Sequence, residues 1–411
     1  MSGRPRALHV APIMPARSGN GLAMRQGLFL EALARSFDVR LVLLPVAERA
    51  DAAPDLPSAL GIPTIIIPTS GLEDTHFALL ARLADPAARL EAFRRYGRSS
   101  LAAGVSAAVL AELRAALGGA AFDLIHIGRS YLADALSATA GAPLVTMDLD
   151  EDEATSSREI ADGWRDHNPY RAAWAEAEAD ALAAGIARTA PSVHRHFISS
   201  EADAAAIGRR HPSLSVEVVE NAIALPPATP RADDGRTLLF LASYGYAPNV
   251  EAVAWFMDAV WPRVRRECKG EVRLRLAGRD AGRLETWRGV DGVEIVGEVA
   301  DVAGVYAEAS VFVAPLRAGA GTRLKLLEAA AHGVPIVTTG IGARGLPFVS
   351  GQHALIADAP ADLARAIAEA LADPAAGARR AAAARALVAE RFDRNRAMPL
   401  LACRLSRLAS R

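Results

Sequence analysis

Short apolar runs alternate with amphipathic stretches along almost the whole N-terminal half of the chain. The first run spans residues 7–13, and a helical pattern over 22–35 leads to a second apolar run over 39–44. Further apolar runs follow at residues 64–67, 122–127, 143–147, 196–200 and 216–219, with helical patterns over 75–117 and 151–190. Buried parallel strands have continuous apolar sequences, because helices cover both faces of their sheet. The alternation therefore predicts a doubly wound α/β domain.

A proline-rich segment separates this series from a second one of the same kind. Residues 225–235 contain three prolines and show no apolar period, which is typical of a linker between domains. Apolar runs then resume at residues 237–242, 272–278, 293–297, 310–315 and 335–339, and helical patterns follow from residue 360. Because 411 residues are too many for one core, we expect two Rossmann-like domains, 1–225 and 226–390. A C-terminal helix, 391–411, is expected to pack back toward the first domain.

The charge balance and the cysteine content indicate which partners and which cellular compartment to expect. The chain has 46 lysines and arginines against 47 acids, which argues against nucleic acid, because phosphate backbones are bound through excess positive charge. Cys268 and Cys403 form no disulfide or metal pattern, and this favours a cytoplasmic location. No apolar run approaches the roughly 20 residues that cross a bilayer. The basic end, 404–411, leaves a peripheral contact with the inner membrane face open, although a solvated helix face is the commoner explanation.

The strongest chemical signal lies in residues 314–329, Ala-Pro-Leu-Arg-Ala-Gly-Ala-Gly-Thr-Arg-Leu-Lys-Leu-Leu-Glu-Ala. An apolar strand ends there, Gly319 and Gly321 shape a turn, and a helix is predicted to start near Thr322. Backbone N–H groups at a helix start form a seat for an anion. Arg323 and Lys325 would lie in the first helical turn, where cations oppose the helix dipole. A bound diphosphate accounts for that placement, and an ordinary strand–helix turn with surface charges is the alternative.

Several fragments around this segment resemble the GT-B glycosyltransferases, specifically the large retaining group usually called family 4. Besides residues 314–329, the matching fragments begin, in chain order, at Phe240, Trp255, Trp261, Leu276, Val296, Tyr306 and Gly333. The resemblance implies a GT-B fold, with two Rossmann-like domains facing across a cleft. It also implies transfer of a sugar, with retention, from a nucleotide-diphosphate sugar to a hydroxyl group. The expected acceptor is a glycan, a lipid-linked sugar or a small metabolite.

The resemblance assigns the donor site to the C-terminal domain. Glu328 would hold the nucleotide ribose, residues 319–325 the diphosphate, and the backbone around Glu298 and Val299 the base. The complete set of expected donor-binding residues is Ser243, Tyr244, Gly245, Asn249, Gly278, Arg279, Glu298, Val299, Arg317, Gly319, Ala320, Gly321, Thr322 and Glu328.

Two departures from the family pattern affect the expected chemistry. Ala320 stands where the family often has a glutamate that contacts the donor sugar, so the sugar stays undetermined. Ser243-Tyr-Gly-Tyr stands where many members have a lysine and an arginine. We infer that Arg323 and Lys325 supply the missing positive charge and stabilise the leaving diphosphate as catalytic residues.

The N-terminal domain is expected to hold the acceptor. Gly19, Asn20 and Gly21 form a loop after the first strand, where backbone N–H groups could bind the acceptor or the donor phosphate. A purely structural turn is the alternative. His126 and Arg129 lie at the end of another strand and are expected at the site, the first as a catalytic and the second as an acceptor-binding residue. A buried structural histidine is the competing interpretation.

An acidic run follows the apolar residues 143–147. Strand alternation puts Asp148 and Asp150 on the same side, and one of them is expected to position the acceptor hydroxyl. A metal site and a solvated helix start are the alternatives. GT-B enzymes generally need no bound metal, so we expect neither a metal nor a tightly bound cofactor. Two other functions stay open: a nucleotide-sugar epimerase of GT-B fold, and a catalytically silent nucleotide-sugar-binding subunit, which Ala320 keeps in view.

Overall fold

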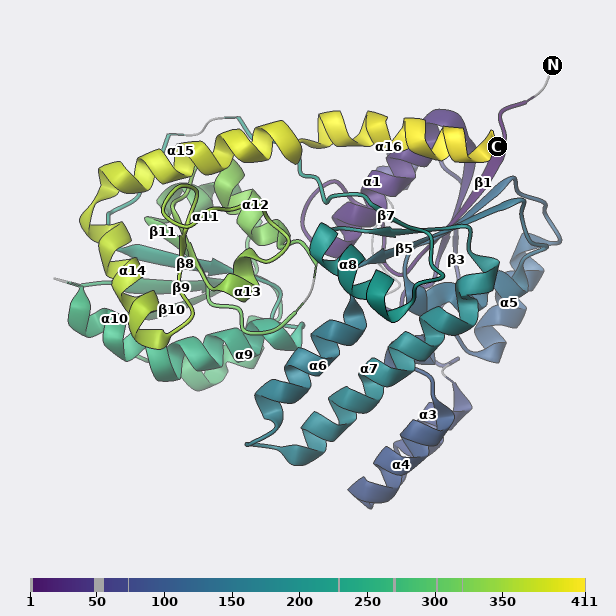
Figure 1. The fold of residues 1–411 in the computed structure, drawn as a ribbon, viewed down its shortest axis with the longest axis horizontal. Helices are drawn as coiled ribbons and strands as arrows, with labels where there is room; N and C mark the ends of the chain where they lie inside the picture. The colour runs from purple at the N-terminus through teal and green to yellow at the C-terminus, as the bar shows by residue number, and fades with distance from the viewer. Residues whose placement is uncertain are drawn as a thin grey trace. The chain divides into compact units, whose positions relative to one another are not determined.

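The chain folds into two compact units, unit 1 (Met1–Ala222 and Arg394–Arg411) and unit 2 (Ile223–Asp393). The computed structural model describes residues 3–47, 55–72, 74–227, 230–268, 271–300, 302–319 and 321–410. Each unit contains one parallel sheet with helices around it (Figure 1).

The sheet of unit 1 has seven strands in the order β3-β2-β1-β4-β5-β6-β7, and every pair is parallel. The strands are β1 (Arg6–Ala11), β2 (Asp38–Leu43), β3 (Thr64–Ile66), β4 (Leu124–Ile127), β5 (Leu144–Asp150), β6 (Arg195–Ile198) and β7 (Val216–Val218). The order reverses direction between β1 and β4, as in a Rossmann-like fold. The expected doubly wound architecture is therefore confirmed for this half of the chain.

Helices of unit 1 cover both faces of this sheet. They are α1 (Gly21–Ser36), α2 (Asp55–Ala59), α3 (Thr75–Leu80), α4 (Pro86–Tyr96), η1 (Ser100–Gly104), α5 (Ala107–Leu117), η2 (Ser130–Ala138), α6 (Glu153–Trp164), α7 (Pro169–Thr189), η3 (Ala190–Ser192), α8 (Glu201–Arg210) and α16 (Arg394–Ala409). The helical pattern over 75–117 is divided into four pieces. Asp85 caps a new helix that begins with Pro86, and Gly97, at φ 66°, ends it in the left-handed conformation.

Alternate residues of the strands feed two separate cores. Leu8 and Val10 of β1 pack with α5 and η2 on one face, whereas Ala7 and Ala11 pack with α1 and α16 on the other. The last helix is tied to α1 by Arg394, whose guanidinium is bound by Glu31 at 2.6 Å. The C-terminal segment of the chain thus completes the core of unit 1.

The sheet of unit 2 repeats the same topology with six parallel strands, in the order β10-β9-β8-β11-β12-β13. The strands are β8 (Thr237–Leu241), β9 (Arg273–Ala277), β10 (Val293–Gly297), β11 (Val311–Ala314), β12 (Ile336–Thr338) and β13 (Leu355–Ile356). The helices are α9 (Ala247–Trp255), a π-helical turn η4 (Phe256–Val260), α10 (Trp261–Glu267), η5 (Ala281–Trp287), α11 (Val302–Glu308), α12 (Leu324–Ala331), α13 (Gly340–Ala343), α14 (Pro360–Ala372) and α15 (Pro374–Arg391).

The strand order of unit 2 changes direction between β8 and β11. In open parallel sheets, ligands bind at the carboxyl ends of the strands beside such a switch point. The loops that leave β8 and β11 are residues 242–246 and 315–323. The topology therefore places the segment that the sequence singled out at the expected ligand-binding edge of unit 2.

Candidate functional site

The carboxyl ends of β8, β9 and β10 are joined by backbone hydrogen bonds beyond the strands themselves. Tyr244 N donates to Arg279 O at 2.9 Å, and Gly278 N donates to Gly297 O at 2.6 Å. Gly278 has φ 130°, and a Cβ there would lie 1.8 Å from the carbonyl oxygen of Ala242. Only glycine fits at this position, because its backbone passes directly against the neighbouring loop. This rigid edge fixes one side of the candidate site.

The loop after β11 forms the other side. Gly319 and Gly321 have φ values of 117° and 77°, which glycine adopts without strain. The guanidinium of Arg323 folds back and donates a hydrogen bond to Gly319 O. Thr322 is buried, and Ala320 lies outside the described residues. The loop is anchored below by Thr339, whose hydroxyl donates to Leu316 O at 2.5 Å.

Lys325 connects this loop to the segment after β8. The helix α12 begins at Leu324, two residues later than the expected start near Thr322, and the capping residue Arg323 makes no side-chain capping bond. Lys325 Nζ donates a hydrogen bond to Asn249 Oδ1 at 2.6 Å, and Asn249 Nδ2 donates to Ser243 O at 2.7 Å. Three expected donor-site residues therefore form one hydrogen-bonded chain across the switch point.

The ionisable groups on α12 are strongly affected by burial. Burial and the nearby positive charge of Arg323 lower the pKa of Lys325 to about 7. Burial raises the pKa of Glu328 to about 7, although the attraction of Lys325 opposes this rise. Burial and the charge of Glu328 also raise the pKa of Tyr306 well above its usual value. The charged forms of Lys325 and Glu328 are thus both disfavoured by burial that their neighbours do not fully offset. Buried ionisable groups with such shifted pKa values are typical of ligand-binding sites.

The remaining expected donor residues lie around this chain. Gly245 follows Tyr244 in the loop after β8, and Arg279 is half-buried after β9. Arg317 is exposed, with its guanidinium 5.5 Å from the ring centre of Trp255. Glu298, which is exposed, and Val299, which is half-buried, follow the edge strand β10, two strands from β8. Figure 1 shows these strand ends within unit 2.

In unit 1, Asp148 is a buried partner of an arginine that the sequence analysis did not consider. Arg25 of α1 binds Asp148 through two hydrogen bonds of 2.7 Å, and neither side chain is exposed. Arg25 also donates to Val219 O and to Asn221 Oδ1, each at 2.9 Å. The Asp148 side chain has no accessible surface in this conformation, and its expected part in positioning the acceptor stays a prediction.

Asp150 lies at the same end of β5 and remains partly accessible. Its φ is 62°, one of two positive values among the described non-glycine residues, and the pairing of β5 with β6 is irregular at this point. Arg129 donates to Asp150 at 2.8 Å and to Glu153 at 2.6 Å, and Arg25 lies 3.3 Å from Asp150. The Asp150 side chain is 17% exposed. Backbone strain of this kind is concentrated at functional sites.

His126 is buried inside unit 1. Its Nδ1 lies 2.9 Å from Thr146 Oγ1, and its ring stacks on Phe29 at 4.4 Å. Burial, together with the neighbouring His9 and Arg25, lowers the pKa of His126 well below its usual value. A neutral, fully buried ring has no access to substrate in this conformation. This burial is what the alternative of a structural histidine expects, and the catalytic role of His126 stays a prediction.

The glycine loop of unit 1 starts helix α1. Asn20 caps the helix, and its Oδ1 accepts hydrogen bonds from the N–H groups of Leu22 at 2.8 Å and Ala23 at 3.4 Å. Gly19 has φ 92°, and Gly21 is the first helical residue. The Asn20 side chain is thus used for capping, and any ligand would meet the backbone of this loop.

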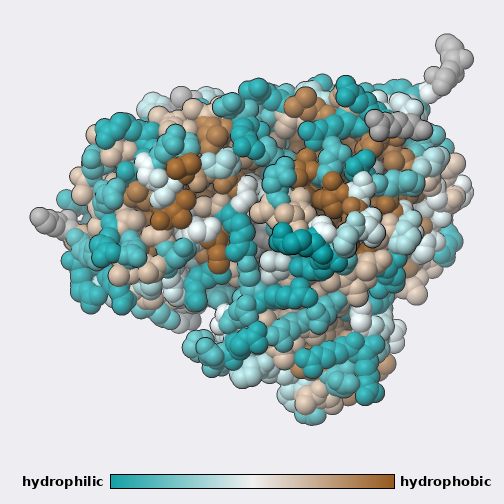
Figure 2. Space-filling model, viewed as in Figure 1, coloured by the Kyte–Doolittle hydropathy of each residue, from teal (hydrophilic) through white to brown (hydrophobic). Residues whose placement is uncertain are grey.

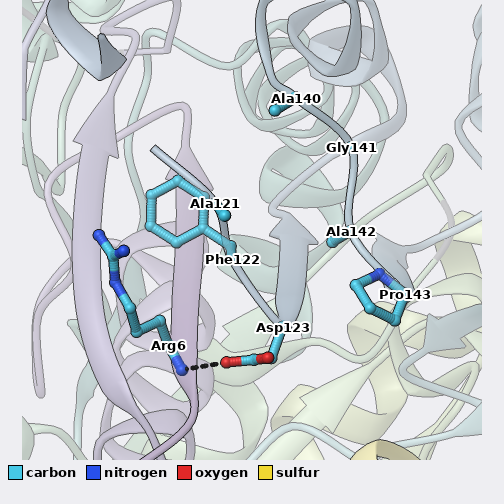
Figure 3. A pocket seen from close by; sticks show the side chains of 8 residues that line it. All are labelled: Arg6, Ala121, Phe122, Asp123, Ala140, Gly141, Ala142 and Pro143. Carbon is cyan, nitrogen blue, oxygen red and sulfur yellow. Dashed lines mark hydrogen bonds between the residues drawn. The ribbon is translucent and has the colours of Figure 1, made fainter. Parts of the chain in front are cut away.

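A hollow of about 520 Å³ lies at the end of the unit 1 sheet where the strands β1, β4 and β5 begin (Figure 3). It is bordered by Arg6 at the start of β1, by Phe122 and Asp123 before β4 and by Pro143 before β5. Figure 3 shows the backbone N–H of Arg6 bonded to Asp123, at 2.7 Å. Because these are the amino ends of the strands, the hollow is separate from the candidate site.

The described residues show neither a metal-binding cluster nor a membrane-spanning helix. No group of three or more histidine, cysteine, aspartate or glutamate side chains in this part of the chain is arranged to hold a metal ion. No described helix combines the length and the apolar composition that crossing a bilayer requires.

Part of the C-terminal unit is similar to a known protein family. Residues 235–373 match the family model described as Glycosyl transferases group 1. This span includes the loops after β8 and β11 and the whole of α12. A comparison of the sequence with curated proteins gives no match.

Solved structures share the fold over nearly the whole chain. The Anabaena protein HepE, in complex with UDP and glucose, is 14% identical with a TM-score of 0.63, and the match covers 98% of this chain and 99% of that one. Sucrose-phosphate synthase from Thermosynechococcus elongatus is 15% identical with a TM-score of 0.66, and 98% of each chain is covered. A glycosyltransferase from Rickettsia africae is 10% identical with a TM-score of 0.59 and full coverage of both chains.

The resemblance expected from the sequence is confirmed by these findings, and so is the expected enzyme class. The structural likeness confirms the GT-B fold, and the family match falls on the unit that carries Lys325 and Glu328. Residues 235–373 therefore match the family described as Glycosyl transferases group 1, and the chain has the GT-B fold of known glycosyltransferases.

Proposed function

We propose that the protein transfers a sugar, with retention, from a uridine-diphosphate sugar bound by unit 2 to a hydroxyl group of an acceptor bound by unit 1. The observation that carries this proposal is the hydrogen bond from Lys325 to Asn249, 2.6 Å long. It holds an ammonium group at the switch-point edge, beside the start of α12. A diphosphate there would meet Lys325, Arg323 and helix N–H groups together.

The uridine base is supported by related structures. HepE has been solved with UDP-glucose, and TarM of S. aureus has been solved with UDP, fondaparinux and alpha-GlcNAc-glycerol. TarM matches 71% of this chain at 12% identity, with a TM-score of 0.56, and 57% of the TarM chain is covered. In this chain, Glu328 would accept hydrogen bonds from the ribose hydroxyls, and the backbone at Glu298 and Val299 would contact the base.

For the chemistry, the diphosphate leaves with the electron pair of the bond to the sugar, while the acceptor hydroxyl attacks the same face and its proton passes to the departing diphosphate oxygen. Arg323 and Lys325 stabilise the charge that develops on the diphosphate. Asp150, held by Arg129 at the end of β5, would receive the hydrogen bond of the acceptor hydroxyl. We propose a glycan or lipid-linked sugar as the acceptor class, with a peripheral membrane contact and a cytoplasmic location.

Calorimetric titration of the full chain with UDP, GDP, ADP and their glucose conjugates tests the donor site. We expect UDP to bind, and Lys325→Ala to weaken binding at least about tenfold, since it removes a charge-assisted contact. Arg365→Ala is the matched control, because Arg365 is exposed on α14 and pairs only with Asp362 among the described residues. Binding of no nucleotide by folded protein would contradict the proposal.

Turnover tests the reaction itself. We expect Lys325→Ala to lower transfer to a panel of glycan and lipid-linked acceptors on the order of 100-fold, as the loss of one transition-state donor typically does. Nuclear magnetic resonance of UDP-glucose incubated without acceptor would detect an epimerised product and so the epimerase alternative. Tight nucleotide binding without any turnover across the panel would instead identify a silent subunit.

A further inference from the structure

Exposed apolar side chains of unit 1 are concentrated in one segment. In the described part of the chain, four of the eight exposed large hydrophobic side chains lie within residues 66–101, namely Ile66, Leu79, Leu83 and Leu101. Leu79 is 55% exposed and Leu83 is 37% exposed. They lie in α3 and in the turn before α4, which together form the α3–α4 hairpin, residues 75–96. Figure 1 shows this hairpin on the far side of α7 from the sheet.

One face of the α3–α4 hairpin is fixed to the body of unit 1. Leu80 and Leu90 are buried in a cluster with Ala177 of α7, and Phe93 stacks on Trp174 with ring centres 4.4 Å apart. The hairpin therefore has a defined orientation. Its other face carries the two exposed leucines, Leu79 and Leu83.

The exposed face is also basic. The α3–α4 hairpin, residues 75–96, contains four arginines and two acids, in a chain whose net charge is −1. Both acids are engaged, because Asp85 caps α4 and Glu91 pairs with Arg95 at 2.9 Å. Arg82 and Arg94 are exposed, and their guanidinium groups make no hydrogen bond or ion pair within the described part of the chain. Figure 2 shows hydrophobic and hydrophilic side chains interleaved over this end of unit 1.

We propose that the α3–α4 hairpin binds the surface of a bilayer that contains anionic lipids. Leu79 and Leu83 would enter the headgroup boundary, and Arg82 and Arg94 would contact lipid phosphates. Exposed leucines and unpaired cations in the same short hairpin favour an interaction site, and the positive excess fits an anionic surface. The α3–α4 hairpin would thus be the surface of the membrane contact proposed above. Binding of the nucleotide-sugar donor is not required for this contact.

The outer face of α16 is the competing surface, and it fits a membrane less well. It presents one exposed leucine, Leu400, at 62%. Arg404 of this face is already bound by Glu217, at 3.3 Å, and by Val218 O, at 3.0 Å. The helix offers charge but little apolar area for insertion, whereas the α3–α4 hairpin offers both.

Flotation of the full chain with phosphatidylcholine vesicles, with and without phosphatidylglycerol, tests the proposal. We expect binding only to the anionic vesicles. Leu79→Ser with Leu83→Ser should lower the partition coefficient at least about tenfold, because the buried apolar area is lost. Arg82→Gln and Arg94→Gln should each lower it about fivefold on anionic vesicles. Leu400→Ser with Arg407→Gln is the matched control on α16 and should leave binding unchanged.

All the altered side chains are exposed, so each variant should unfold at the same temperature as the native chain. A thermal unfolding measurement therefore shows whether a variant has lost vesicle binding or has lost its fold. The proposal is overturned if the native chain fails to float with anionic vesicles, or if only the α16 control loses binding. In either case UDP binding would be unaffected, so failure here is distinguishable from failure of the proposed transferase.

Discussion

Lys325 and Asn249 meet across the switch point of the second sheet, with Lys325 Nζ 2.6 Å from Asn249 Oδ1. The ammonium lies 4.9 Å from the ring centre of Phe240, and its pKa is lowered to about 7 by burial and by Arg323. A protein keeps a cation in so unfavourable a place when a ligand supplies the missing negative charge.

We expect Lys325→Met to weaken UDP binding at least about tenfold and to leave the free protein as stable as before, or more stable. The pKa of Lys325 is lower in the folded state than its ordinary value of 10.5. The unfolded state therefore binds this proton more tightly, so the lysine destabilises the fold at neutral pH, and this effect disappears above about pH 10.5. Thermal unfolding at pH 7, without nucleotide, measures the change. A clear fall in Tm would contradict this account.

Binding of UDP should weaken as pH rises from 7 to 9. A bound diphosphate favours the charged form of Lys325 and raises its pKa, so above pH 7 the free protein must take up a proton in order to bind. The affinity should fall by up to about tenfold per pH unit in this range. Lys325→Arg keeps its charge and should remove this dependence. Since Glu328 titrates in the same range, any slope that remains in the arginine variant belongs to Glu328.

The strands can be predicted from the sequence because each one is marked by the apolar composition of its own residues. Short segments rich in apolar residues mark every strand except β13, which has only two residues, Leu355–Ile356, and is too short to show a pattern. The helical region 75–117 was less well predicted, since its division depends on caps such as Asp85 and on the left-handed Gly97. Helix-forming composition alone does not show these breaks.

The candidate site was predictable where its chemistry is local. Lys325 attracts attention because a cation near a helix start opposes the dipole. Its contact with Asn249, 76 residues away, depends on how α9 and α12 pack and is not visible from spacing. Arg25 was missed for the same reason. It lies among apolar residues of α1, and an arginine there is a sign of a buried partner, but only the fold shows that the partner is Asp148.

Gly278→Ala should disrupt the edge of unit 2. A Cβ at this residue would lie 1.8 Å from Ala242 O, and φ is 130°, so both contact and backbone strain oppose any side chain. We expect a loss of several kcal/mol in the free energy of unfolding, on the order of 3 kcal/mol or more, together with loss of UDP binding. Gly282→Ala, in η5 with no atom within 4 Å of the added Cβ, is the control. Chemical denaturation that gave equal stabilities would contradict the assigned close approach.

Substitutions of the two aspartates at the end of β5, Asp148 and Asp150, should have different effects, the first mainly on stability and the second mainly on sugar transfer. Asp148→Asn leaves Arg25 buried without its bidentate partner, so we expect a loss of about 3–5 kcal/mol in the free energy of unfolding. Asp150→Asn removes a partly exposed carboxylate whose partner Arg129 retains Glu153, at 2.6 Å. Its stability should change less, by about 1 kcal/mol. In contrast, its turnover with a glycan acceptor should fall by about 100-fold or more. UDP binding, measured by calorimetry below the unfolding transition, should be unaltered in both variants, because both residues lie in unit 1. If Asp150→Asn transferred sugar at the native rate, Asp150 would have no part in positioning the acceptor, and its left-handed backbone would need a structural explanation.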